Sequence, residues 1–381
     1  MEEKYDSLIA LRHELHRYPE LSGQEHETAA RIHAFLRPMK PEQVLTKVGG
    51  HGVVALFDSG MPGPEVWFRA DMDALPVNES IQLDYVSEHP GVSHKCGHDG
   101  HTAILAGLAE YISIHRPAKG RVLLLFQPAE ETGQGAAAML MALKVLGFSP
   151  DYAFALHNLP GYPLNSVIVR NGTFAAASRG MVIRLKGKTS HASEPEKGMS
   201  PVAVMARLMV DLPGLSSNGE LKGYRDFVLL TLIYGNLGSP AFGTSPGEAV
   251  LMATLRAYQN EDMEELCARA TELVRRHSDA AAMGCEISFA EEFPATVNHP
   301  EAVLHVRDAA GSLGLPLIEA GLPFRWSEDF AHFALESKAA LFGIGAGTDH
   351  PPLHHPDYDF PDAVIPTGLE LWKSIYMKLL G

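Results

Sequence analysis

One short stretch of the sequence holds several side chains that bind metal ions in proteins. Cys96 and His98 flank Gly97, and Asp99 and His101 follow them directly. A thiolate and an imidazole at this spacing can bind one metal ion, and glycine permits the tight backbone that such a loop needs. A Cys-Gly-His pattern also occurs by chance in histidine-rich surface loops. The added acid and histidine favour a metal site, because metal-bound histidines usually have acidic partners behind them.

Two adjacent carboxylates, Glu130 and Glu131, form a second candidate site directly after the apolar run 121–127. Buried carboxylates are costly unless a cation compensates them. Because adjacent side chains diverge, one acid could bind a metal ion while the other moves a proton of the bound water. The alternative is a solvated helix N-terminus, where acidic residues are common.

Further histidines and acids lie at the ends of other predicted strands. His157 ends an apolar run, Asp71 and Asp73 follow another, and His354 lies in a proline-rich stretch at 349–360. A lone histidine is more often a core or rim residue than a metal ligand. A proline-rich loop is often a solvent-exposed loop without a functional role. Ligands of parallel sheets gather at the carboxyl ends of the strands, so these segments together indicate one site.

The predicted elements explain how these residues could meet. Short apolar runs alternate with helical stretches through the first part of the chain, at 52–57, 65–70, 102–115, 121–127, 134–146 and 152–157. This alternation is typical of an α/β fold with a mainly parallel sheet covered by helices on both faces.

The pattern changes between about 180 and 291. Strand, helix, two strands, helix and strand are expected at 181–186, 201–212, 226–234, 248–258, 261–283 and 285–291. This βαββαβ order is that of a ferredoxin-like unit. The α/β pattern then returns, with elements expected at 302–313, 327–337, 341–345 and 366–379. We therefore predict a catalytic domain formed by residues 1–178 and 292–381, with a smaller domain inserted at 179–291.

The composition excludes several classes of partner. A formal charge of −15 over 381 residues, without a Lys/Arg-rich run, would repel nucleic acid and anionic membranes. The apolar runs are too short to span a bilayer, and the polar N-terminus does not resemble a signal peptide. Three cysteines are too few for a disulfide framework in a chain of this size. We expect a cytoplasmic protein that acts on a small molecule.

The motifs together resemble one known family over essentially the whole length of the chain. They are the stretches 69–76, 96–103, 127–133, 156–158 and 353–360, with the N-terminal helix at 11–22 and the stretch 326–330. Their order is similar to that of the aminoacylase, hippurate hydrolase and auxin-conjugate hydrolase group of the dinuclear-zinc metallopeptidases. The resemblance implies a zinc-peptidase-like catalytic domain and an inserted lid and dimerisation domain in a homodimer.

The resemblance also implies a set of metal ligands. Two divalent metal ions would bind through Cys96, His98, Glu131, His157 and His354. Zinc is the implied metal, with manganese, cobalt or nickel as alternatives, since selectivity depends on geometry and supply. The acids that would support these ligands are Asp71, Asp73 and Asp99. His354 is preferred over His355 because it fills the fixed histidine of the family's Leu-His-x-Pro pattern.

The implied reaction is hydrolysis of the amide bond of N-acyl amino acids or short peptides. A metal-bound hydroxide would attack the carbonyl, and Glu130, as general base, would pass the proton to the departing amine. In the inserted domain, His191 would stabilise the carbonyl oxygen, commonly across the dimer interface. Arg256 is in keeping with substrate binding, whereas Gly243 stands where relatives usually carry an asparagine that helps hold the substrate's carboxylate.

Two other functions remain open from the sequence. Cys96 could be a nucleophile with His98 as its base, but this would leave Glu131 and the other candidate ligands without a role. A peptide- or metabolite-binding protein on the same fold would have little use for Glu130 as a general base.

Overall fold

The computed structural model describes residues 5–217 and 219–381. The chain divides into two compact units. The first contains the chain up to Phe174, Thr296–Pro323 and Asp329–Gly381, and the second contains Ala175–Ala295 with Phe324–Glu328. The second unit is therefore inserted into the first, where we expected an insertion at 179–291.

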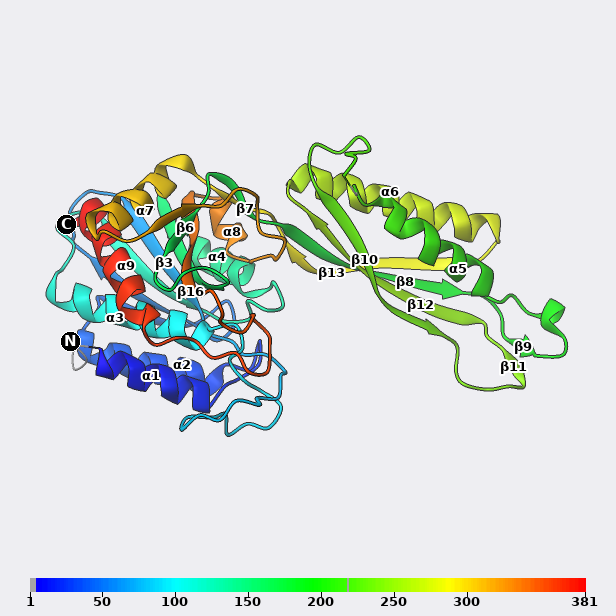
Figure 1. Cartoon of the computed structure of the whole chain (residues 1–381), viewed down its shortest axis with the longest axis horizontal. Helices are drawn as coiled ribbons and strands as arrows, with labels where there is room; N and C mark the ends of the chain where they lie inside the picture. Colours follow the sequence, from blue (N-terminus) through cyan, green and yellow to red (C-terminus); the bar gives the residue numbers. More distant parts are fainter. Residues whose placement is uncertain (1–4, 218) are drawn as a thin grey trace. The chain divides into compact units, whose positions relative to one another are not determined.

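An eight-stranded sheet forms the centre of the first unit, in the order β1-β2-β4-β3-β5-β16-β6-β15 (Figure 1). The strands are β1 (Gln43–Val48), β2 (Gly52–Asp58), β3 (Glu65–Asp71), β4 (Arg121–Gln127), β5 (Tyr152–Pro160), β6 (Val167–Val169), β15 (Leu317–Glu319) and β16 (Lys338–Gly347). The four central strands, from β4 to β16, pair in parallel, while β1, β2 and β6 have antiparallel neighbours. The predicted mainly parallel α/β sheet is confirmed.

Helices cover both faces of this sheet because side chains of its buried strands alternate between the faces. The helices are α1 (Asp6–Arg17), α2 (His26–Leu36), α3 (His98–Ile114), α4 (Gly135–Val145), α7 (Pro300–Ser312), α8 (Ala331–Ala334) and α9 (Val364–Leu380). In β3, the Phe68 ring packs against the Trp372 ring of α9, with the ring centres 5.9 Å apart. The adjacent Trp67 lies on the opposite face, where it packs against Phe333 of α8, with the ring centres 5.7 Å apart.

The second unit is a four-stranded antiparallel sheet with the order β10-β12-β8-β13. Its elements in chain order are β8 (Ala177–Lys186), α5 (Val202–Asp211), β10 (Val228–Leu237), β12 (Glu248–Ala257), α6 (Asn260–Ala280) and β13 (Gly284–Phe293). The apolar stripe of α6, which includes Leu266 and Val274, packs into one core with Ile183 and Leu251 of the sheet. The predicted ferredoxin-like unit is confirmed, and β10 and β13 form its edges.

Short strands complete the two units. In the second unit, β9 (Ser190–His191) pairs with β11 (Thr244–Ser245) as a small ribbon. Nearer the junction in sequence, β7 (Gly172–Ala175) pairs with β14 (Thr296–Asn298). Among the described helices, none combines the length and apolar character that a membrane span requires.

Some local predictions were wrong. Helix α3 begins at His98 rather than near 101, and α8 covers only four residues of the expected 327–337. Helix α2 and strand β1 were not predicted; the buried residues of α2 are Thr28, Ile32 and Leu36, and only Val48 of β1 is buried.

Candidate metal centre

The carboxyl ends of neighbouring strands bring the acidic and histidine motifs together. Asp71 is the last residue of β3, and Glu130 and Glu131 follow β4. His157 lies inside β5, which continues to Pro160, so the expectation that His157 ends its strand was wrong. Because β4, β3 and β5 are parallel neighbours, these side chains reach the same edge of the sheet.

A tight turn places Cys96 and His98 at the start of α3. Gly97 between them has a φ of 94°, which glycine adopts without strain. A Cβ atom on Gly97 would lie 2.3 Å from Oδ1 of Asn158, so a side chain cannot fit there. His98 is the first residue of the helix, and its position is therefore fixed by the helix rather than by a free loop.

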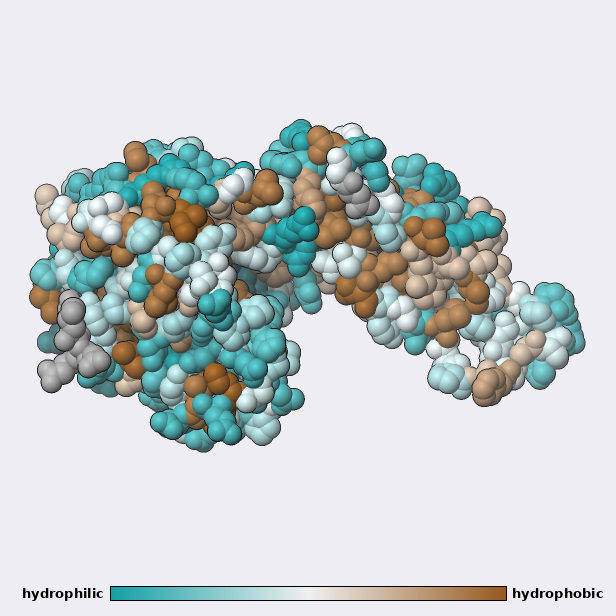
Figure 2. Space-filling model, in the orientation of Figure 1, coloured by the Kyte–Doolittle hydropathy of each residue, from teal (hydrophilic) through white to brown (hydrophobic). Residues whose placement is uncertain are grey.

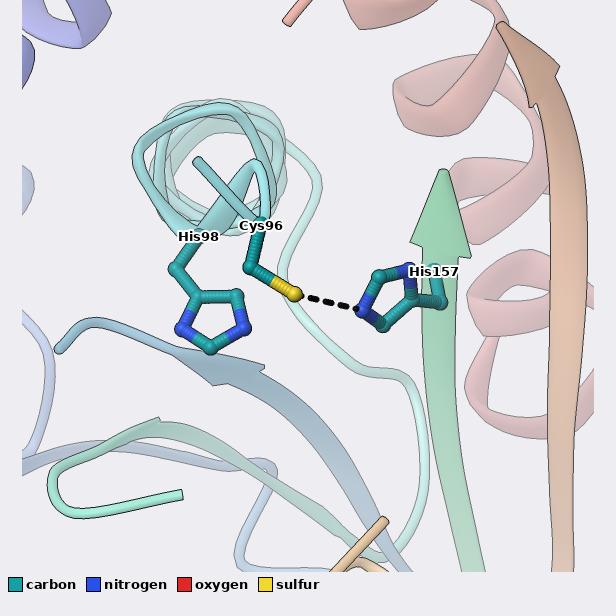
Figure 3. Close-up of side chains that lie close together, drawn as sticks. All are labelled: Cys96, His98 and His157. Atoms are coloured by element: carbon teal, nitrogen blue, oxygen red, sulfur yellow. Dashed lines mark hydrogen bonds between the residues drawn. The ribbon is translucent and has the colours of Figure 1, made fainter. Parts of the chain in front are cut away.

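Cys96, His98 and His157 form a first group of donor atoms (Figure 3). Sγ of Cys96 lies 3.6 Å from Nε2 of His157, and the His98 ring leaves the same turn as Cys96. Two ligands of one tetrahedral zinc ion are about this far apart, because Zn–S bonds are about 2.3 Å and Zn–N bonds about 2.0–2.1 Å long. The group thus has the composition and the spacing of a metal site.

Cys96 also belongs to a second group, with Glu131 and His354, whose donor atoms lie within 4.8 Å of one another. Nε2 of His354 is 3.7 Å from Oε1 of Glu131, and Nε2 of His98 is 3.8 Å from the same oxygen. The His354 side chain is 53% exposed, and its φ of 65° is in the left-handed region that non-glycine residues rarely adopt. The two groups share Cys96, so two ions could bind side by side.

Two atoms within these groups are buried without a hydrogen-bond partner in the described chain, namely Nε2 of His98 and Oε1 of Glu131. A buried polar atom left unpaired is costly, and such atoms are rare in native proteins. A metal ion would bind both atoms. The donor set of thiolate, imidazole and carboxylate therefore fits zinc or a similar divalent ion.

Two carboxylates, Asp73 and Asp71, lie behind the candidate ligands. Asp73 accepts the backbone N–H of Glu131 at 3.0 Å, and its Oδ1 lies 3.2 Å from Nδ1 of His98. Asp71 bonds both to Nδ1 of His101 and to the Arg69 guanidinium, each at 2.6 Å. Both Asp71 oxygens already have partners, although Asp71 could also group with His98 and His101 around an ion.

Burial and mutual charge determine the proton affinities of the site. Burial raises the pKa of the Cys96 thiol well above its usual value, and the Glu131 carboxylate raises it further. Burial also raises the pKa of Glu131 to about 7. Burial alone would lower the pKa of His98, but the charge of Asp71 raises it well above its usual value. Protons held in these places compete with a metal ion, because ligands must be deprotonated to bind it.

Glu130 has a different environment from Glu131. The Glu130 residue is 5% exposed, and its Oε1 accepts the backbone N–H of Asp329 at 3.4 Å. Asp329 is itself held by Nη2 of Arg69 at 2.9 Å and by Nε2 of Gln127 at 2.8 Å. Glu130 thus lies beside the candidate ligand groups and contacts a buried network of hydrogen bonds.

A buried polar network behind the site was missed from the sequence. Asp99 accepts Nε of Arg12 at 2.9 Å and lies 2.8 Å from Nδ1 of His16. Arg12 and His16 occupy the apolar face of α1, where two polar residues four positions apart are the signal that could have revealed them. Lys95 and Glu79 belong to the same network, through an ion pair.

Lys95 connects the cysteine turn to the segment that carries His354. Its Nζ donates to the carbonyl of Tyr358 at 2.7 Å, and its own carbonyl accepts the N–H of His354 at 2.7 Å. Lys95 is fully buried. These bonds hold the second group's histidine next to Cys96.

The second unit holds the remaining predicted site residues. His191 is exposed in the β9–β11 ribbon, and its Nδ1 lies 2.7 Å from Oγ of Ser193. Gly243 lies beside it, since its carbonyl accepts the N–H of Ala192. A Cβ atom on Gly243 would meet no atom within 4 Å, so packing does not require glycine there. Nη1 of Arg256 donates to the carbonyl of Arg325 at 2.7 Å.

Comparison with known proteins agrees with this architecture. The family model "Peptidase family M20/M25/M40" matches residues 67–378. The N-acetyl-L-cysteine deacetylase of Bacillus subtilis is 31% identical over 96% of this chain and 87% of its own length. Thermostable carboxypeptidase 1 of Saccharolobus solfataricus is 31% identical over 93% of this chain and 89% of its own.

A solved structure of the YXEP protein of Bacillus subtilis, a dinuclear metal-binding peptidase, matches with a TM-score of 0.83. It is 26% identical, and the match covers 100% of this chain and 99% of that one. The fold and the clustered site define an amide-bond hydrolase. The chain belongs to peptidase family M20/M25/M40.

Proposed function

We propose that this protein is a metal-dependent amidohydrolase that cleaves N-acyl amino acids or short peptides. The observation that carries the proposal is that Cys96 belongs to two adjoining groups of donor atoms, within which buried atoms of His98 and Glu131 have no hydrogen-bond partner in the described chain. Two divalent ions would be held there by Cys96, His98, Glu131, His157 and His354. Such ions polarise a carbonyl group and make water a nucleophile at neutral pH.

Glu130 is the proposed general base and acid. It is buried, adjacent to the ligand Glu131, and able to group with His98. Its carboxylate would take a proton from the attacking water and hold it at one oxygen. It would then deliver the proton to the amine that leaves when the amide bond breaks. The N–H of Asp329 orients the carboxylate for both steps.

The proposed substrate is an amide of an amino acid that keeps a free carboxylate. The two relatives with 31% identity are a deacetylase of N-acetyl-L-cysteine and a carboxypeptidase. In both reactions the departing amine belongs to an amino acid with a free carboxylate. The family's usual asparagine is replaced by Gly243, so the clamp on that carboxylate would differ here.

The second unit is proposed to form a homodimer and to supply His191 to the site of the partner. Its edge strand β10 exposes Ile233, Tyr234 and Leu237, and α5 exposes Val210. Figure 2 shows hydrophobic side chains gathered over this part of the unit. An unpaired apolar edge strand is a surface on which another strand can pair. The His191 ring, exposed on its ribbon, would donate to the developing oxyanion of the substrate.

A Cys96 nucleophile explains the geometry less well. Cys96 is 7% exposed, whereas a nucleophilic thiolate must be reached by the substrate. That function would also leave Glu131 and His354 grouped around the sulfur without a role.

The test is a panel of N-acyl amino acids and dipeptides, assayed on protein of measured metal content. Hydrolysis should disappear when a chelator removes the metal and return when zinc or manganese is added. N-acyl amino acids whose carboxylate is amidated serve as matched controls and should be cleaved more slowly. Turnover that survives complete metal removal would contradict the proposal and favour Cys96 as a nucleophile.

A further inference from the structure

The residue directly before Glu130 has a strained backbone. Ala129 has a φ of 53°, in the left-handed region where a non-glycine residue is unfavourable. Such conformations persist only where neighbouring contacts hold them, and they cluster at functional sites. The carbonyl of Ala129 accepts the N–H groups of Gln134 and Gly135, at 3.3 and 3.1 Å. These bonds fix one side of the Ala129 peptide.

The other side is fixed by a distant carboxylate. Oε1 of Glu25 accepts the N–H of Ala129 at 2.8 Å, across 104 positions of sequence, and also accepts the N–H of Gly23 at 2.8 Å. Glu25 is fully buried, and its Oε2 has no hydrogen-bond partner in the described chain. Burying a carboxylate with one oxygen unpaired is costly, so a simple turn would not require it.

Capping of helix α2 does not account for Glu25. That helix begins at His26, and its first N–H groups are met by a different acid. Glu20 accepts the N–H of Thr28 at 2.7 Å and that of Glu27 at 3.1 Å. The contact that distinguishes Glu25 is therefore the one with Ala129.

We propose that Glu25 is a positioning residue for Glu130. Glu25 accepts the N–H of Ala129 and so holds the strained backbone of that residue. It thereby fixes the direction in which the Glu130 side chain leaves the backbone. Glu131 has its own anchor, because its N–H donates to Asp73. Glu25 should thus set the orientation of the proton-transferring acid with little effect on the metal ligands. The catalytic part of this inference rests on the proposed function.

The test compares Glu25→Ala with Glu25→Gln, whose amide oxygen can still accept both N–H groups. Hydrogen exchange, read by mass spectrometry on a peptide that contains residues 127–134, reports on the loop without any substrate. Exchange at Ala129 should be faster in Glu25→Ala and close to wild type in Glu25→Gln. Equal exchange in all three proteins would overturn the inference.

Turnover is then measured on the substrate that the wild type cleaves best. Glu25→Ala should lose roughly tenfold to a hundredfold in kcat, since small misplacements of a catalytic group cost this much, with metal content and KM near wild type. Glu25→Gln should recover most of that loss. Glu20→Ala is the matched control, because it removes a carboxylate cap from α2 without touching Ala129, and its kcat should not change. Faster exchange in Glu25→Ala with unchanged kcat, or an equal loss in Glu20→Ala, would overturn the positioning role.

A second substitution tests the strain directly. Ala129→Gly removes the penalty of a positive φ, because glycine adopts this conformation readily. Added to Glu25→Ala, it should restore kcat severalfold, whereas purely additive losses would contradict the inference. A wild-type protein that cleaves no compound of the panel would refute the proposed function instead, and the exchange measurement would still report on Glu25.

Discussion

Glu130 and Glu131 are neighbours in the chain, yet their carboxylates meet different partners. Glu131 lies with Cys96 and His354, while Glu130 accepts a backbone N–H from Asp329. This difference in environment is what the proposed division of metal binding and proton transfer between two identical side chains requires.

Substitution of each acid by glutamine should separate these roles. Glu130→Gln should keep its metal and lose about 10²–10⁴-fold in kcat, the usual contribution of a general base. Glu131→Gln should lose metal as well as activity, because an amide is a poorer ligand than a carboxylate. Metal analysis and steady-state kinetics on both variants provide the measurement. Equal metal loss in the two proteins would show that the roles are misassigned.

The thiol of Cys96 offers a test that needs no substrate. A metal-bound cysteine is held as a shielded thiolate, so alkylation of Cys96 should be slow in the loaded protein and faster after chelation. Cys267 and Cys285 belong to the other unit and are internal controls. Mass spectrometry of the alkylated peptides gives all three rates. A Cys96 rate that does not respond to chelator would count against its assignment as a ligand.

The candidate ligands could be named from the sequence because each belongs to a short motif that resembles one of a known family. The residues that contact Asp99 could not be named from the sequence. Arg12 and His16 reach it from α1, more than eighty positions away, and only the packing of α1 on α3 brings them there. Glu25 was missed for the same reason, since its partner Ala129 is apolar and carries no chemical signal.

At the scale of elements, Glu79 joins its segment to helix α1 through His16 and to the cysteine turn through Lys95. Glu79 accepts from Nε2 of His16 at 2.9 Å and pairs with the fully buried Lys95. Burial alone would raise the pKa of Glu79, but the hydrogen bonds from His16 and Lys95 lower it from 4.5 to about 2. The ionised carboxylate therefore stabilises the fold.

This shift predicts how stability depends on pH. Because the pKa of Glu79 is lower in the folded state, its stabilisation is fully present above about pH 4.5 and is lost as the pH falls toward 2. Glu79→Gln should therefore lower the free energy of unfolding most near pH 6, and the difference from wild type should shrink below pH 4.5. Urea unfolding at several pH values measures it, and Glu88→Gln controls for the change in net charge. A pH-independent difference would contradict this account.

Most elements with strong periodicity were predicted correctly, and those that depend on tertiary context were not. The central strands follow from their continuous apolar runs, and α6 follows from the apolar stripe along one of its faces. Strand β6 has three residues and exists because β16 and β15 pair with it on either side. Helix α3 starts earlier than expected because its first turn, from His98 to His101, is polar yet fully buried against other polar groups.

At the scale of the whole molecule, the proposed exchange of His191 between subunits can be tested by complementation. His191→Ala should lose roughly 10²–10³-fold in turnover, as expected for one oxyanion donor, and Glu130→Gln should also be nearly inactive. Mixed under conditions that allow subunits to exchange, the two variants should recover up to about a quarter of wild-type activity. At equal amounts, half of the dimers contain one subunit of each variant. In each of these dimers, one of the two sites has both Glu130 and the partner's His191, which gives a quarter of the wild-type sites.

Labelled subunits show whether exchange has taken place, and each variant incubated alone is the control. If mixed dimers form and activity does not return, His191 acts within its own chain or has no part in the reaction.

The position of β16 has a consequence for how the protein is made. This strand lies in the middle of the large sheet and pairs with β5, although Lys338 opposite Tyr152 is about 190 residues further along the chain. At synthesis rates of about 5–20 residues per second, β5 waits roughly 10–40 s for its neighbour, with an unpaired edge exposed to the cell. The whole second unit is made in that interval and has its own core on which to fold. The segment that carries His354 follows β16 along the chain, so the last ligand of the proposed metal centre is synthesised only after the last strand of the sheet.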